Sequence, residues 1–221
     1  CHIGSQLTTI APFVEAAQKI KGLVMELQKN GISLKNLDLG GGLGICYKDE
    51  VPPTPADYAK AILEVVGDLN LKLIFEPGRF MVGNSAMLLG SVIYNKKSET
   101  KNFIIIDAAS NNLMRPTLYG AYHESRPVTL HPDRPQIIAD IVGPICETGD
   151  FLAPDRTIQT CEPKELIAFM SAGAYGFAMS GTYNSRPRCA EIMVSGDQFE
   201  VIREAETLED LTRGEKVPTF V

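Results

Sequence analysis

Residues 37–44, LDLGGGLG, place a short apolar stretch directly before three consecutive glycines. Residues 73–79, LIFEPGR, repeat this arrangement, because an apolar stretch again runs into a turn. Each stretch follows an amphipathic helical pattern, one at 10–27 and one beginning at Pro55. This alternation predicts parallel strands and helices up to about residue 82.

The predicted helices carry recognisable end signals. Thr9 is the expected cap of the first helix and Gly31 its expected stop. Thr54 is the expected cap of the second helix, with Pro55 at the first position, where a missing N–H costs nothing.

Polar or glycine-rich residues follow every predicted strand of this half, at 2–5, 40–42 and 76–79. The first of these groups follows what we interpret as the end of a strand, and we expect the sequence given to lack an amino-terminal part. Ligands of parallel α/β folds bind at the carboxyl ends of the strands. The sequence therefore predicts a binding site where these three groups meet.

The second half is predicted to be a mostly antiparallel β domain. The expected strands are 86–93, 103–106, 137–142, 166–170, 189–194 and 199–203. Ser195-Gly196-Asp197 predicts a hairpin turn between the last two strands. A short closing helix is expected between Thr207 and Gly214. We therefore predict two domains, 1–82 and 83–221.

Composition excludes several classes of protein. The 221 residues carry a net charge of −6, which disfavours nucleic acid as a partner. We expect no signal peptide, and no apolar run of these residues reaches the ~18 residues that a membrane span needs. The five cysteines, an odd number, contain no C-x-x-C pair, so we expect reduced thiols, a cytoplasmic protein and no metal site.

Taken singly, each chemical motif also allows a purely structural interpretation. Gly40-Gly41-Gly42 suits either an anion site or a tight turn, and EPGR at 76–79 either an anion site or a surface salt bridge. Cys146, in GPICETGD at 143–150, is either reactive or a small core residue.

Tyr119 and the segment 180–186 suit either a binding site or a surface loop. His2 is either a site residue or a core histidine, whereas His123 and His131 are expected at the surface.

Taken together and in order, the motifs carry a resemblance that covers essentially the whole sequence. The chain resembles the fold-type III pyridoxal-phosphate-dependent decarboxylases, and among them the diaminopimelate decarboxylases. The matching segments are HIGSQ at 2–6, LDLGGGLG at 37–44, EPGR at 76–79, NNLMRPTLYGAYH at 111–123, GPICETGD at 143–150 and GAYGFAMSGTYNSRPR at 173–188. The resemblance implies the carboxyl-terminal part of a TIM-like (β/α)8 barrel, followed by an antiparallel β-sandwich or barrel.

The resemblance also implies a pyridoxal 5′-phosphate site at the strand ends of the first half. The cofactor-binding residues are expected to be Ser5, Gly40, Gly41, Gly42, Glu76, Pro77, Gly78, Arg79 and Tyr183. Glu76 would face the pyridine nitrogen and keep it protonated, and His2 would stack on the ring. Arg79 would reach the phosphate or a substrate carboxylate.

For the substrate, the resemblance implies a site that recognises an amine and a carboxylate together. Arg115 would bind the distal carboxylate, Glu147 the amine, and Tyr119 and Tyr183 would add hydrogen bonds. Cys146 would be the general acid that supplies the proton replacing carbon dioxide, since a thiol with a pKa near 8.5 is mostly protonated at neutral pH. In this family the Cys–Glu loop reaches the partner's site, so a homodimer is expected.

The sequence departs from the family pattern at Asn112, Gly181 and Cys189. It also shows no lysine at the position of the family's Schiff-base lysine, since Lys72 and Lys101 stand elsewhere in the motif order. We therefore expect these 221 residues alone to be inactive and not to bind the cofactor covalently.

The implied reaction is decarboxylation of meso-2,6-diaminopimelate to L-lysine, the last step of lysine biosynthesis. The alternatives are a related decarboxylase of arginine, ornithine or carboxynorspermidine, or a non-catalytic regulatory relative. A regulatory protein would need neither Cys146 nor Glu76 and Arg79.

Overall fold

The computed structural model describes residues 1–220. The chain divides into two compact units, Cys1–Ala86 and a second unit that begins at Met87. The sequence placed the corresponding boundary at residues 82 and 83. Each unit is described by itself.

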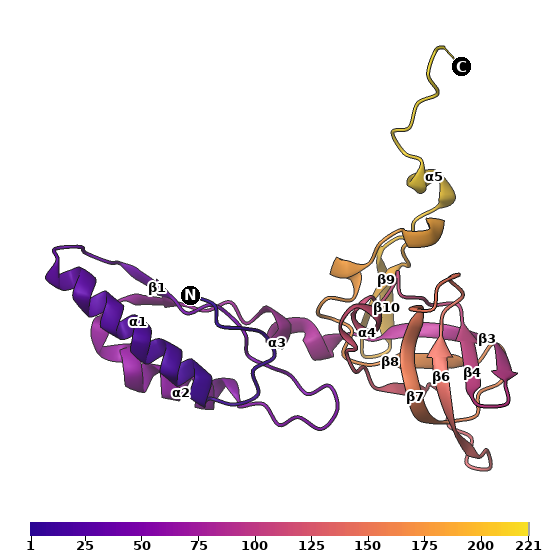
Figure 1. The fold of residues 1–221 in the computed structure, drawn as a ribbon, viewed down its shortest axis with the longest axis horizontal. Helices are drawn as coiled ribbons and strands as arrows, with labels where there is room; N and C mark the ends of the chain where they lie inside the picture. Colours follow the sequence, from indigo (N-terminus) through magenta and orange to yellow (C-terminus); the bar gives the residue numbers. More distant parts are fainter. Residues whose placement is uncertain (221) are drawn as a thin grey trace. The chain divides into compact units, whose positions relative to one another are not determined.

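The first unit contains two short strands that pair in parallel, β1 (Asn36–Asp38) and β2 (Lys72–Ile74). The helices α1 (Ala11–Lys29) and α2 (Pro55–Val66) precede these strands and pack against each other (Figure 1). The 3₁₀ turns η1 (Gly67–Leu69) and η2 (Gly83–Ser85) and the short helix α3 (Gly78–Val82) complete the unit. The predicted order of helix, strand, helix and strand, with parallel pairing, is confirmed. The strand end expected before residues 2–5 is wrong, because the described residues form no strand there and only Leu7 makes an isolated parallel bridge, with Leu43.

Two of the three residues predicted to mark a helix end in this unit do so in the structure. Thr54 Oγ1 accepts a hydrogen bond from the Asp57 amide (3.1 Å) at the start of α2. Gly31 follows the last residues of α1 with a left-handed φ of 80°. The predicted cap at Thr9 is wrong. The cap is Ile10, whose carbonyl accepts from the amides of Phe13 and Val14, so the first turn starts one residue later.

The second unit is built on a six-stranded sheet in the order β5-β8-β3-β4-β6-β7. Its strands are β3 (Leu88–Lys97), β4 (Asn102–Ile106), β5 (Ser125–Pro127), β6 (Gln136–Val142), β7 (Phe151–Gln159) and β8 (Leu166–Phe169). Only the β4–β6 pairing is parallel within this sheet, and the edge strands β5 and β7 also contact each other. The sheet is therefore a nearly closed, mostly antiparallel barrel.

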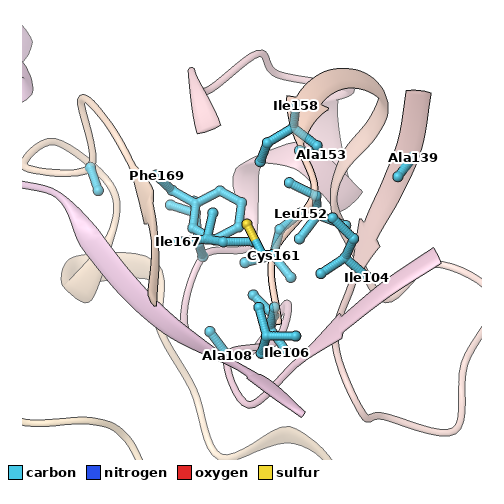
Figure 2. Packing of buried hydrophobic residues seen from close by; sticks show 14 residues of the cluster. Ile104, Ile106, Ala108, Ala139, Leu152, Ala153, Ile158, Cys161, Ile167 and Phe169 are labelled. Atoms are coloured by element: carbon cyan, nitrogen blue, oxygen red, sulfur yellow. The ribbon is translucent and has the colours of Figure 1, made fainter. Parts of the chain in front are cut away.

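The interior of this barrel is filled by aliphatic side chains and one phenylalanine (Figure 2). Ile104, Ile106, Leu152, Ile167 and Phe169 are each completely buried. The sulfur of Cys161 lies among them, and burial raises the pKa of this thiol to about 11. The five cysteines are free in this structure.

Strands β5 and β7 were not predicted. Pro154, Asp155 and Arg156 interrupt the apolar pattern of β7, and the β6–β7 ladder shifts register there. Asp155 lies at this irregularity and has a left-handed φ of 50°. Alternation alone could not reveal a strand that is broken at its centre.

The carboxyl-terminal elements match the prediction. Strands β9 (Glu191–Ser195) and β10 (Gln198–Arg203) form the expected hairpin. Thr207 caps the helix α5 (Leu208–Leu211) through a capping box with Asp210, although the helix ends before Gly214. The remaining short elements are α4 (Arg115–Tyr119), η3 (Phe177–Met179) and η4 (Tyr183–Ser185). Within residues 1–220, no helix has the length and apolar character needed to cross a membrane.

Glu165 forms a polar clip between the start of β8 and the loop before β6. Its carboxylate contacts Arg134 Nη1 (2.6 Å) and His131 Nε2 (3.1 Å) and accepts from the Glu162 amide (2.8 Å). The hydrogen bond from Arg134 is the main reason why the pKa of Glu165 falls to about 2. The ionised form is therefore favoured in the folded state.

This clip predicts an acid-dependent loss of stability. A carboxyl whose pKa is lowered by folding stabilises above its unfolded pKa near 4.5, and loses that contribution as the pH falls through about 2. We expect Glu165→Gln to be less stable than wild type at pH 7, by a difference that shrinks towards pH 2. Urea midpoints measured at pH 7, 4 and 2.5 check this, and a pH-independent difference would contradict it.

Candidate active site

The glycine turn of the first unit lies against the two other polar segments predicted to meet there. The Glu76 amide donates to the Gly40 carbonyl (2.8 Å), and the Gly41 amide donates to Nδ1 of His2 (3.3 Å). The His2 side chain is exposed, so the interpretation of His2 as a core histidine is wrong. The structure thus brings His2, the three glycines and Glu76 together at one edge of the β1–β2 pair.

Glycine is required at all three positions because another part of the backbone lies too close to leave room for a side chain. A Cβ at Gly40 would lie 2.3 Å from the Cys1 carbonyl oxygen, and one at Gly42 would lie 2.3 Å from that of Gly4. A Cβ at Gly41 would lie 2.1 Å from the Glu76 carbonyl oxygen. Backbone packing alone therefore explains the glycines.

The amides of this turn are partly engaged within the chain. Gly40 donates to Asp38 Oδ1 (2.8 Å), and Gly41 donates to His2. To hold an anion, either amide would have to exchange its present partner. This finding limits the predicted cofactor role of the glycine backbone.

We expect Gly41→Ala to destabilise the protein, because its methyl group would meet a backbone oxygen that cannot move aside. Overpacking of this kind costs about 1–3 kcal/mol or more. The matched control is Gly22→Ala in α1, where a Cβ meets nothing within 4 Å and alanine favours the helix. Chemical denaturation of both variants checks the prediction, and equal stabilities would overturn it.

Arg79 and Ser5 form the cationic part of this edge. Arg79 lies in α3 directly after Pro77 and Gly78, where Pro77 is the helix cap. Its guanidinium donates to Ser5 Oγ (2.9 Å) and to the Tyr47 hydroxyl (2.7 Å). Tyr47 was not predicted, since it stands outside the quoted motifs.

The first-unit residues have the chemistry that a phosphorylated pyridine cofactor needs. Ser5 accepts from Arg79 and keeps its own O–H for an anion, and the guanidinium adds charge beside it. Glu76 is an exposed acid next to the same glycine turn. An anion-binding group and an acid for a ring nitrogen are therefore present at one edge.

In the second unit, the loop at 143–150 is organised by a buried aspartate. The Asp150 carboxylate accepts from the amides of Ser110 and Ile145, both at 2.7 Å, and the Asp150 carbonyl accepts from Gly143. Cys146 and Glu147 are exposed at the tip of this loop. The interpretation of Cys146 as a core residue is therefore wrong; the buried thiol is Cys161.

Tyr183 lies beside the same loop. Its hydroxyl is hydrogen-bonded to the Glu147 carboxylate, and this bond is the main reason why the pKa of Tyr183 is raised. Cys146 is close enough to contribute to the same effect. The structure thus brings together Cys146, Glu147 and Tyr183, three residues that the resemblance assigned to the site.

The segment that carries Tyr183 is held by Asn111, which is buried. Asn111 Nδ2 donates to the Gly181 carbonyl (3.1 Å), and its Oδ1 accepts from Arg186 Nε (3.3 Å). Arg186 Nη2 also donates to the Asp107 carbonyl (2.5 Å). The fixed loop geometry, with a left-handed φ at Asn184, depends on these contacts.

Arg115 begins α4 and is 8% exposed. Thr117 Oγ1, in the same helix, donates to the Gly149 carbonyl (2.7 Å), which joins α4 to the loop that carries Cys146. Tyr119 ends the helix and is 66% exposed. The predicted carboxylate-binding and proton-donating residues therefore lie on two elements that contact each other.

His123 corrects the sequence interpretation. It was expected at the surface, but it is 0% exposed and its ring contacts Arg115. His131, by contrast, is partly exposed.

Two of the three departures from the family pattern contact each other. The Asn112 side chain is hydrogen-bonded to Cys189, and its Oδ1 accepts from the Ala109 amide (3.1 Å). An amide oxygen fills this acceptor role as well as a carboxylate oxygen would.

The predicted site residues thus form two sets. Those for the cofactor, except Tyr183, lie in Cys1–Ala86, and those for the substrate, except Arg79, lie in the second unit. The described residues contain no group of three or more histidine, cysteine or acidic side chains arranged to hold a metal ion.

Comparison with known proteins identifies relatives that match nearly all of this chain. A family model described as "Pyridoxal-dependent decarboxylase, C-terminal sheet domain" matches residues 22–173. The diaminopimelate decarboxylase of Neisseria meningitidis serogroup B is 53% identical over 209 residues, 95% of this chain and 50% of that protein. That of Pseudomonas aeruginosa is 49% identical over 217 residues, 98% of this chain and 52% of that protein. The chain spans about half the length of these curated relatives.

Solved structures agree with this similarity. The Helicobacter pylori diaminopimelate decarboxylase complexed with L-lysine aligns with a TM-score of 0.90 and 42% identity, over 96% of this chain and 52% of that one. The M. jannaschii enzyme in co-complex with L-lysine aligns with a TM-score of 0.95 and 38% identity, over 100% of this chain and 52% of that one.

Proposed function

We propose that this chain, which belongs to the pyridoxal-dependent decarboxylase family, is the carboxyl-terminal half of a diaminopimelate decarboxylase. The complete enzyme would convert meso-2,6-diaminopimelate to L-lysine and carbon dioxide. The observation that carries this proposal is the near-complete match of the chain to proteins of that name, at about half identity.

The bound pyridoxal phosphate would supply an electron-accepting ring that weakens the bond to the departing carboxylate. Ser5 and Arg79 would bind its phosphate, together with the backbone at Gly40–Gly42 and the hydroxyl of Tyr183. Glu76 would hold a proton on the pyridine nitrogen, and His2 would cover one face of the ring. The hydrogen bond between Arg79 and Ser5 supports this assignment.

The second unit would bind the end of the substrate that does not react. Arg115 would bind the distal carboxylate, Glu147 the distal amine, and Tyr119 would add a hydrogen bond. Cys146, on the exposed tip beside Glu147, would donate the proton that takes the place of carbon dioxide. The hydrogen bond from Thr117 Oγ1 to the Gly149 carbonyl fixes the end of this loop against α4.

The buried guanidinium favours a substrate with two carboxylates. Arginine or ornithine would bring no distal carboxylate to Arg115, and a site that forgoes such a bond loses affinity steeply. We further propose that the enzyme is a cytoplasmic homodimer in which the loop at 143–150 completes the partner's site. The exposure of that loop tip and the free thiols are consistent with both statements.

Genetic complementation tests the proposed function. The full-length gene should restore growth without lysine to a bacterium that lacks diaminopimelate decarboxylase, and the Cys146→Ala variant should restore it poorly. Growth that still requires lysine, although the protein accumulates in folded form, would contradict the proposal.

A further inference from the structure

Arg115 contacts the ring of a buried histidine. Its Nη1 lies 2.8 Å from Nε2 of His123, and Nδ1 of His123 lies 2.9 Å from the carbonyl oxygen of Met170. His123 is 0% exposed, and Arg115 is 8% exposed. The contact is therefore buried and links α4 to the residue that follows β8.

These two contacts fix the proton of the imidazole. A carbonyl oxygen only accepts, so Nδ1 must carry the hydrogen that points at Met170. In the neutral ring, Nε2 is then an acceptor, which suits a guanidinium N–H. A protonated ring would turn an N–H towards the arginine instead.

A neutral acceptor orients a cation without offsetting its charge. A carboxylate in the place of His123 would compete with the carboxylate of a ligand, because it would neutralise the guanidinium in advance. The guanidinium is planar and rigid, so a hydrogen bond to one of its nitrogens restrains the orientation of the whole group.

We propose that His123 is the positioning residue of Arg115, and that it sets the affinity of the site for the distal carboxylate of the substrate. The inference rests on the proposed function, since it takes Arg115 as the group that binds this carboxylate. Met170 in turn orients His123, because its carbonyl selects the tautomer that can accept from Arg115.

The test uses the full-length enzyme loaded with pyridoxal phosphate and two complementary substitutions. His123→Gln keeps an oxygen near the position of Nε2 and loses the donor to Met170. His123→Asn keeps a donor near Nδ1 and is too short to reach Arg115. We expect His123→Asn to raise KM for diaminopimelate by about tenfold with kcat changed less than about threefold, and His123→Gln to recover most of that loss.

A double-mutant cycle with Arg115→Met separates positioning from general packing. If His123 acts through Arg115, His123→Asn should add almost nothing to the effect of Arg115→Met on KM. His131→Asn, at a partly exposed histidine of the same unit, is the matched control and should leave KM unchanged. Should His123→Asn fail to fold, His123→Gln is carried through the same cycle, with a smaller expected change in KM.

The outcomes distinguish the two proposals. If Arg115→Met raises KM while neither His123 variant does, or if their effects add, the positioning role is overturned and the proposed function stands. If Arg115→Met also leaves KM for diaminopimelate unchanged, the proposed role of Arg115 fails and the inference falls with it.

Discussion

Replacing Arg115 with methionine in the full-length enzyme is expected to lower kcat/KM for diaminopimelate by about 10² to 10³. The side chain is 8% exposed, so the substrate carboxylate would enter a site without its cation. Wild-type enzyme should reject L-lysine as a substrate by about 10⁴, because lysine lacks the second carboxylate. The variant has no guanidinium to satisfy, so this discrimination should shrink.

The measurement is kcat/KM for both substrates in both proteins. Arg126→Met is a matched control, since Arg126 is an exposed arginine of the same unit that pairs with Glu124. If Arg115→Met keeps the wild-type ratio between the two substrates, Arg115 is a structural arginine and the choice of diaminopimelate loses its main physical support.

Glu76→Gln is expected to lower the decarboxylation rate by about 10² while leaving cofactor affinity nearly unchanged. A glutamine still offers an oxygen to the ring nitrogen, but it does not favour the protonated form as a carboxylate does. The effect belongs to the chemical step, so it should appear in kcat rather than in KM.

Single-turnover rates and the dissociation constant of pyridoxal phosphate separate these two effects. Glu64→Gln, at an exposed glutamate in α2, controls for loss of one negative charge on the same unit. A Glu76→Gln enzyme with an unchanged rate would remove Glu76 from the mechanism.

Local signals in the sequence predicted the local structure well. Thr54 and Thr207 cap the helices they were expected to cap, because a side chain and an amide three residues apart make the bond. The parallel pairing of β1 and β2 followed from the repeated order of helix and strand. These features need only a few neighbouring residues to be recognised.

Features that depend on distant partners were missed. His123 was expected at the surface, yet its ring bonds to a carbonyl 47 residues further along the chain. Asp150 had no assigned role, although its carboxylate holds the amide of Ser110, 40 residues earlier. In both cases the partner is a backbone group, which a sequence pattern does not identify.

The candidate site residues came from the resemblance, and the structure adds how they are supported. Cys146 and Glu147 are presented by a loop that Asp150 closes from inside. Tyr183 reaches Glu147 because Asn111 and Arg186 hold its segment. The motif segments contain both the candidate site residues and the groups that support them, but only the folded chain shows which of these groups contact each other.

The most direct test of the proposed function is carbon dioxide release by the full-length enzyme with pyridoxal phosphate. meso-Diaminopimelate, L-lysine, L-ornithine and L-arginine would be assayed separately at equal concentration. We expect carbon dioxide and L-lysine in equal amounts from diaminopimelate, and rates lower by about 10⁴ from the other three substrates. Faster release from ornithine or arginine, or no release from diaminopimelate by the cofactor-loaded protein, would contradict the assignment.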